Sequence, residues 1–89
     1  MATESSGPRP DGIPGLLIDE IQVTGIFRGK NGYLAQVHGS LPKSFLLREG
    51  DQLFDGDVIN ISSREVVFKQ LVPDGPKPFR EVVKEYRPA

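Results

Sequence analysis

The chain reverses direction at Arg48-Glu49-Gly50-Asp51-Gln52-Leu53-Phe54-Asp55-Gly56-Asp57-Val58, a Gly- and Asp-rich corner between two short apolar runs. Gly50 and Gly56 can supply the positive φ angles that tight turns require. The side chains of Asp51 and Asp55 can accept hydrogen bonds from their own nearby backbone. These residues predict two reversals within one short segment, which is typical of a compact all-β domain.

The three aspartates of this corner also resemble part of a calcium loop. Oxygen ligands at short intervals are what hard cations require, and Asp51, Asp55 and Asp57 provide them. The twelve-residue spacing with a closing glutamate is missing, however, and the corner lies between predicted strands rather than helices. We therefore interpret the aspartates as turn formers and predict no metal or cofactor. Leu53 and Phe54 are expected to pack as an apolar pair beneath the bend.

Size and composition argue against an enzyme. A chain of 89 residues forms one domain at most, and a core this small contributes roughly 3–5 kcal/mol, which disfavours a deep active-site cleft. The sequence has no cysteine, so disulfides, thiolate nucleophiles and cysteine zinc sites are excluded. His38 lies near Ser40, but a third orienting group and an oxyanion hole have no sequence signature. We expect His38 at the end of a strand.

The charge balance gives no general attraction to nucleic acid or to anionic membranes. Lysine and arginine number 11 and aspartate and glutamate 12, for a formal charge of −1. No window approaches the roughly 18 consecutive apolar residues that span a bilayer. Residues 1–7 lack the basic start and apolar middle of a signal peptide. They resemble the start of an excised fragment, and any targeting or anchoring signal is expected upstream.

Two regions of different composition divide the chain. Residues 1–15 contain three prolines and three glycines, which predicts a flexible, extended linker. Residues 16–89 are expected to form the folded domain. At the boundary, Leu16-Leu17-Ile18 is a short apolar run that either packs the end of the linker onto the domain or serves a partner.

Short β-rich runs separated by turn residues fill the domain. We expect six strands, at residues 21–28, 33–38, 44–48, 58–61, 65–71 and 79–86. The Asn31-Gly32 pair predicts a hairpin between the first two, and Gly25 predicts either a bulge or a close backbone contact. The last segment also fits helical spacing, which leaves a helix as the competing prediction. Strands about ten residues apart predict a small sandwich or barrel.

Two binding functions are open to such a domain. Tyr33, Phe45 and Phe68 lie among basic residues, so a small cytosolic single-stranded nucleic-acid-binding barrel is the alternative function. Phe45 and Phe68 also lie in apolar runs that the core needs, and acidic residues interrupt the basic ones. An exposed sheet edge, by contrast, is a template for a partner's strand. A noncatalytic module cut from a larger enzyme is a third possibility.

A family resemblance rests on the order and spacing of several short motifs. They are Gly15-Leu16-Leu17-Ile18-Asp19-Glu20-Ile21, Thr24-Gly25-Ile26, Arg48-Glu49-Gly50-Asp51-Gln52-Leu53, Gly56-Asp57-Val58, Val66-Val67-Phe68-Lys69-Gln70 and Phe79-Arg80-Glu81-Val82. Together they resemble the PilP family of type IV pilus assembly lipoproteins. The globular part of that family is similar to the homology region of the type II secretion protein GspC. The resemblance covers roughly Gly15 to Tyr86.

The resemblance implies a periplasmic, noncatalytic β-sandwich of two small antiparallel sheets with about six to seven short strands. It implies docking on the N-terminal periplasmic domains of the outer-membrane secretin PilQ. The proline-rich segment ahead of the domain would join the inner-membrane proteins PilN and PilO. The family's lipidated cysteine is missing from this sequence, so membrane contact is expected only through an upstream lipid anchor.

These expectations combine into a bridging scaffold of type IV pilus assembly that binds neither nucleic acid nor a cofactor. An open strand edge suits such docking because its unpaired backbone groups can bind a partner's strand. We therefore place the partner-binding surface on the first strand and its hairpin, at Thr24, Gly25, Ile26, Phe27, Arg28 and Lys30.

Overall fold

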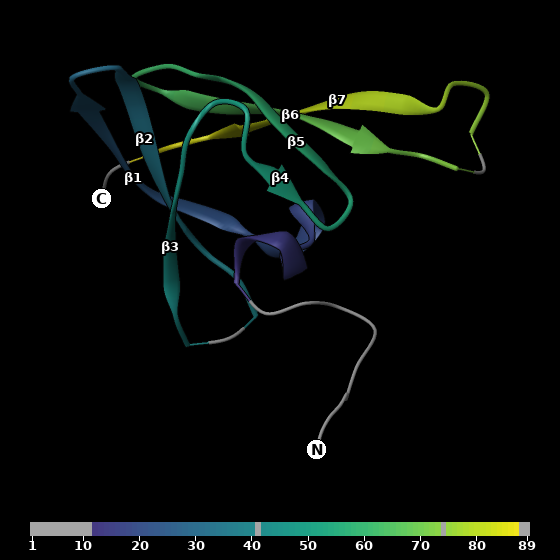
Figure 1. The fold of residues 1–89 in the computed structure, drawn as a ribbon, viewed down its shortest axis with the longest axis horizontal. Helices are drawn as coiled ribbons and strands as arrows, with labels where there is room; N and C mark the ends of the chain where they lie inside the picture. Colours follow the sequence, from purple (N-terminus) through teal and green to yellow (C-terminus); the bar gives the residue numbers. More distant parts are fainter. Residues whose placement is uncertain (1–11, 41, 74, 88–89) are drawn as a thin grey trace.

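Two antiparallel sheets form the domain in the computed structural model, which describes residues 12–40, 42–73 and 75–87. The first sheet has the strand order β1-β2-β3, and the second has the order β4-β5-β6-β7. The strands are β1 (Gln22–Gly29), β2 (Gly32–His38), β3 (Ser44–Leu47), β4 (Gln52–Leu53), β5 (Gly56–Ile61), β6 (Glu65–Leu71) and β7 (Phe79–Glu85). Figure 1 shows the first sheet on the left and the second across the top of the view. The predicted all-β sandwich is confirmed.

The core lies between the two sheets because alternate side chains of the strands point inward. Its buried apolar residues are Leu16, Ile18, Ile21, Ala35, Val37, Leu47, Leu53, Val58, Ile61, Val66 and Phe68. Phe45 and Tyr33 are half-buried and pack against this cluster. Phe68 is fully buried, so it cannot stack on a base, and the core needs it as the sequence predicted.

The predicted hairpin joins β1 and β2. Gly29 pairs with Gly32, which leaves Lys30 and Asn31 as a two-residue loop, and Gly32 has a φ of 125°. A bulge interrupts the β1–β2 register between Val23 and Gly25. Gly25 also lies against an aromatic ring, since a Cβ there would be 3.0 Å from Cζ of Phe27. The hairpin and the irregularity at Gly25 are therefore both confirmed.

The corner between β3 and β5 reverses the chain twice, as predicted, with the two-residue strand β4 between the reversals. Gly50 has a φ of 92°, and the backbone N–H of Arg48 donates to Asp51 Oδ2 at 2.9 Å. These two residues therefore act as the turn formers that the sequence indicated. The predicted apolar pair is wrong in one member, because Leu53 is 6% exposed but Phe54 is 43% exposed.

Gly56 is needed for a different reason from the predicted one. It does not have a positive φ; it is a buried residue of β5. A Cβ at this position would overlap the carbonyl oxygen of Lys69 on β6 and lie 2.8 Å from Cδ1 of Ile18. Glycine is thus required because β5 packs closely against β6 and against Ile18 of the N-terminal segment, the part of the chain that precedes β1.

The final segment is a strand rather than a helix. β7 pairs antiparallel with β6 from Glu65↔Glu85 to Leu71↔Phe79. In the strand, Val82 is half-buried and its neighbour Val83 is exposed, which is the period of two expected for a sheet. Tertiary pairing with β6 therefore decides between the two periodicities that the sequence left open.

The N-terminal part of the domain packs onto the core through two short 3-10 helices, η1 (Ile13–Gly15) and η2 (Ile18–Glu20). Leu16 and Ile18 are buried, so the apolar run at the start of the domain covers the core. Ile13, within the predicted linker, also contacts the core; residues 1–11 of that linker lie outside the described residues. Along the described ranges, no helix has the length and apolar character needed to cross a membrane.

Candidate functional site

The edges of the two sheets are the natural places for a partner strand. The edge strands are β1 and β3 in the first sheet and β4 and β7 in the second. The N-terminal segment lies against β4, because the backbone N–H of Phe54 donates to the Leu16 carbonyl oxygen at 2.9 Å. This contact occupies part of the β4 edge, so β1, β3 and β7 are the edges that remain for a partner.

β1 is the best suited of these three edges. β7 carries charged side chains at Arg80, Glu81, Lys84 and Glu85, and charges on an edge strand discourage the addition of another strand. β3 has 4 residues, whereas β1 has 8 and a single charged residue, Arg28. Length and low charge thus favour strand addition at β1.

The structure places the six predicted docking residues on β1 and its hairpin loop but on different faces. Thr24 lies at the bulge, and its hydroxyl donates to the Gln36 carbonyl oxygen at 3.3 Å. Ile26 is half-buried and packs against the core, while Gly25 is buried. The exposed members are Thr24, Phe27, Arg28 and Lys30. These four side chains, together with the backbone of β1, are available to a partner.

Phe27 belongs to an apolar patch on the outer face of the first sheet. It pairs across the sheet with Leu34, and Leu46 pairs with Gln36 one strand further on. Phe27 is 49% exposed and Leu46 is also exposed. The sequence prediction missed Leu46. Three consecutive apolar residues, Phe45 to Leu47, were a usable signal, because successive side chains of a strand point to opposite faces and one of them must face outward.

A groove lies at the tip of the β1–β2 hairpin. This hairpin-tip groove has a volume of about 470 Å³ and is lined by residues 29–34 together with Arg48 and Glu49. Lys30 and Arg48 are exposed cations. The carboxylate of Glu49 is engaged, because its Oε2 accepts the backbone N–H of Ile61 at 3.0 Å. With two cations and one carboxylate, the groove lining has a net positive charge next to the end of β1.

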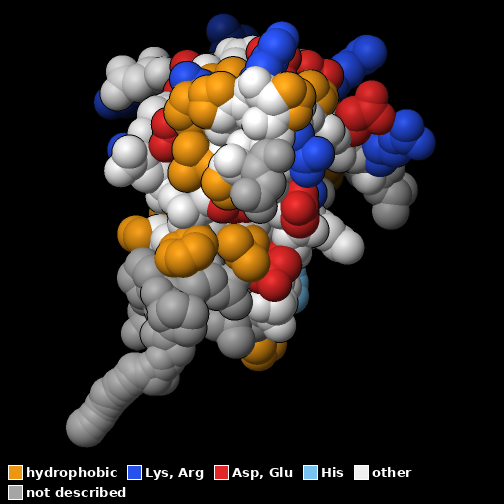
Figure 2. Space-filling model, turned by 90° about the vertical axis from the view of Figure 1, so that its right-hand side faces the viewer, with side chains coloured by type: hydrophobic (Ala, Val, Ile, Leu, Met, Phe, Trp, Pro, Cys, Tyr) orange, Lys and Arg blue, Asp and Glu red, His pale blue; other side chains and the backbone are white. Residues whose placement is uncertain are grey.

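A second apolar surface lies at the loop end of the β6–β7 hairpin, where Leu71 pairs with Phe79. Phe54, Leu71 and Phe79 are each exposed and line a shallow pocket of about 300 Å³. The ammonium of Lys69 lies 4.1 Å from the centre of the Phe79 ring. Figure 2 shows apolar side chains gathered over this side of the molecule, with basic and acidic side chains around them. Such exposed clusters often mark protein contacts.

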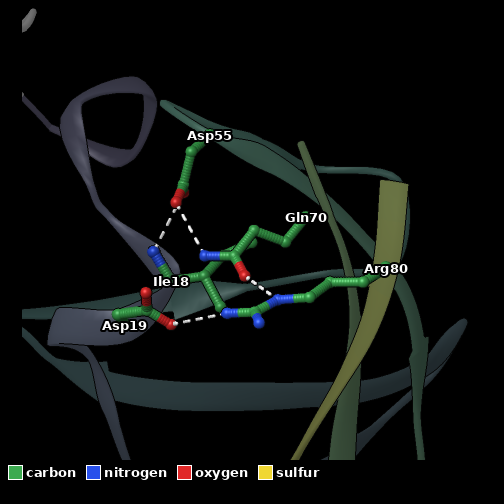
Figure 3. A network of polar contacts seen from close by, with 5 residues as sticks. All are labelled: Ile18, Asp19, Asp55, Gln70 and Arg80. Carbon is green, nitrogen blue, oxygen red and sulfur yellow. Dashed lines mark hydrogen bonds and ion pairs between the residues drawn. The ribbon is translucent and has the colours of Figure 1, made fainter. Parts of the chain in front are cut away.

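The N-terminal segment is attached to the second sheet by a polar network centred on Asp55 (Figure 3). Asp55 Oδ1 accepts the backbone N–H of Ile18, and Asp55 Oδ2 accepts the side-chain amide of Gln70, both at 3.0 Å. Gln70 Oε1 accepts Nε–H of Arg80 at 2.7 Å, and Arg80 lies 3.9 Å from Asp19 Oδ1. Asp55 thus joins segments far apart in sequence, which corrects its prediction as a simple turn former.

The described residues hold no group of three or more His, Cys, Asp or Glu side chains arranged to bind a metal ion. Asp51, Asp55 and Asp57 therefore do not converge on one point. Asp51 bonds locally to Arg48, whereas Asp55 bonds to Ile18 and Gln70.

These features define a small two-sheet β-sandwich with a free edge strand and a tethered N-terminal segment. It is similar to the solution structure of PilP from Pseudomonas aeruginosa, with a TM-score of 0.73 and 20% identity over 100% of this chain and 83% of that one. Two structures of a domain from the type IV pilus biogenesis lipoprotein PilP of the same organism are also similar. One has a TM-score of 0.67 and 20% identity over 90% of this chain and 98% of that one. The other has a TM-score of 0.60 and 24% identity over 85% and 88%.

The chain therefore has the PilP fold, as the sequence resemblance implied. No protein-family model matches the sequence, and no curated protein matches it either.

Proposed function

We propose that this chain is the globular domain of a type IV pilus biogenesis lipoprotein and acts as a noncatalytic scaffold in the periplasm. Two independent lines support the proposal. The ordered sequence motifs resemble the PilP family, and the structure has the fold of PilP from Pseudomonas aeruginosa over its whole length. In this role the domain links the inner-membrane proteins PilN and PilO to the outer-membrane secretin PilQ, and an upstream lipid anchors the protein to the inner membrane.

Docking on the N-terminal domains of the secretin takes place at β1. This surface is chosen because β1 is the longest of the free edge strands and contains one charged residue. Phe27 is exposed beside it. A partner strand added to this edge gains backbone hydrogen bonds, and Phe27 supplies an apolar contact for its side chains. The N-terminal segment makes the contact with PilN and PilO. The Asp55 network holds this segment on the second sheet, the one that does not contain β1.

Titration of the ¹⁵N-labelled domain with the cognate secretin's N-terminal domains tests this proposal. The amides of β1 are expected to shift more than those of β7, because the added strand bonds directly to the β1 backbone. Absence of binding at high micromolar concentration would exclude direct docking.

A matched pair of variants locates the surface. Phe27 and Leu71 are 49% and 48% exposed, and they lie on different sheets. Phe27→Ala is expected to weaken secretin binding about tenfold, as loss of a buried aromatic contact does at an interface, while Leu71→Ala leaves it unchanged. The reverse result would move the docking surface to the pocket formed by Phe54, Leu71 and Phe79.

A further inference from the structure

We propose that the hairpin-tip groove binds an acidic segment of the partner that docks on β1, with a carboxylate of that segment placed between Lys30 and Arg48. This inference rests on the proposed function and adds the chemistry of the partner.

The position of the groove couples it to the docking edge. Gly29 is the last residue of β1, and it is also part of the groove lining. A strand added along β1 advances about 3.3 Å per residue. Arg48 follows β3, on the far side of β2 from β1, so a segment that reaches the groove continues past the paired part and crosses the hairpin tip toward β3. At about 470 Å³ the groove falls within the range of small ligand sites. One or two side chains of the docked segment can enter it.

The charged residues that line the groove favour an acidic side chain as its ligand. Lys30 and Arg48 both line it and are exposed, and no ion pair joins either to another residue in the described ranges. Arg28, which pairs across the hairpin with Tyr33, is a further cation near the end of β1 but lies outside the groove lining. Glu49 also lines the groove, and its Oε2 accepts the Ile61 N–H, so the two cations and one carboxylate give the lining a net charge of +1. The whole chain has a formal charge of −1, so this positive cluster is local.

Arg48 also gives the site geometric selectivity. A guanidinium binds a carboxylate through two parallel hydrogen bonds, whereas the flexible Lys30 ammonium acts as a point charge. An acidic residue in the segment that crosses the hairpin tip would engage both groups. The groove therefore adds selection by charge to docking on β1, whose residues 22–27 are uncharged.

The first test uses a capped hexaglutamate peptide and the ¹⁵N-labelled domain at low salt. We expect saturable shifts in the amides of residues 29–34, Arg48 and Glu49, which disappear at about 0.3 M salt because exposed charges are then screened. The Lys30→Glu/Arg48→Glu double variant is expected to lose these shifts. Lys77→Glu, an exposed charge reversal outside the groove lining, is expected to keep them. Shifts that fall elsewhere, or that persist in the double variant, would overturn the proposal.

The second test measures binding of the cognate secretin N-terminal domains to the same variants. Loss of two exposed ion pairs is expected to weaken binding about tenfold in the double variant, with Lys77→Glu unchanged. Equal binding by the wild type and the double variant would refute the groove while leaving docking on β1 intact. If the secretin domains bind neither chain although hexaglutamate occupies the groove, the acidic specificity is supported and the secretin is the wrong partner. Matching amide spectra away from the groove establish that each variant is folded.

Discussion

At the scale of single residues, Gly56 is the position where packing most strictly requires glycine. Gly56→Ala places a Cβ against the Lys69 carbonyl oxygen and 2.8 Å from Ile18 Cδ1, and neither neighbour is the free end of a flexible side chain at the surface. We expect a loss of about 3 kcal/mol in the free energy of unfolding, which is comparable to the whole stability of so small a domain. Chemical denaturation measures it.

Gly39→Ala is the matched control for that experiment. A Cβ at Gly39 would lie 3.4 Å from Leu16 Cδ2 and 3.7 Å from Ile21 Cγ2, which are ordinary contact distances. A change within about 0.5 kcal/mol is expected there. Equal effects at Gly39 and Gly56 would show that close packing against β6 is not the reason for the glycine.

Gly50 is constrained by its backbone instead. Its φ of 92° lies in the left-handed region, and no atom lies within 4 Å of an added Cβ. Gly50→Val is expected to lose more than about 1–2 kcal/mol, because branched side chains tolerate this conformation poorly. Gly50→Asn is expected to lose less, since asparagine enters this region more readily. Thermal unfolding of both variants checks the order, and equal melting temperatures would contradict it.

At the scale of elements, the Asp55 network controls how the N-terminal segment is held. Asp55→Ala leaves the Ile18 N–H and the nearly buried Gln70 amide without their acceptor, which costs about 1–3 kcal/mol. Hydrogen exchange of the Ile18 amide is expected to accelerate more than that of amides in the middle of β2. Because both carboxylate oxygens of Asp55 accept hydrogen bonds within the chain, added calcium is expected to leave the melting temperature of the parent chain unchanged. A calcium-dependent rise would contradict this assignment.

Local patterns predicted most of the elements. The Asn31-Gly32 turn signal and the alternation in β2 and β6 depend on neighbouring residues, so the sequence was sufficient to locate them. Asp55 and Ile18 are separated by 37 positions, and no local signal joins them. The role of Gly56 likewise depends on β6 and on the N-terminal segment, which meet it only in the folded chain.

At the scale of the whole molecule, the sequence predicted a sandwich and an open edge but not how the edges are distributed. That depends on which strands are central and on the N-terminal segment lying against β4. Of the expected docking residues, alternation along β1 turns Ile26 toward the core and leaves Phe27 outside. The hairpin-tip groove was not predicted from the sequence. Lys30 and Arg48 belong to separate turns, which come together only in the folded sheet.

The attachment of the N-terminal segment has a mechanical consequence. A pull on this segment acts on Ile18, whose side chain is fully buried and whose backbone N–H is bonded to Asp55. Tension therefore enters the domain at the corner between β4 and β5, in the second sheet. The docking strand β1 begins at Gln22, directly after this segment, so the anchor at Ile18 bears the load before it reaches β1 along the chain. In the proposed scaffold, motion of the inner-membrane platform would reach the secretin as displacement of an intact sandwich.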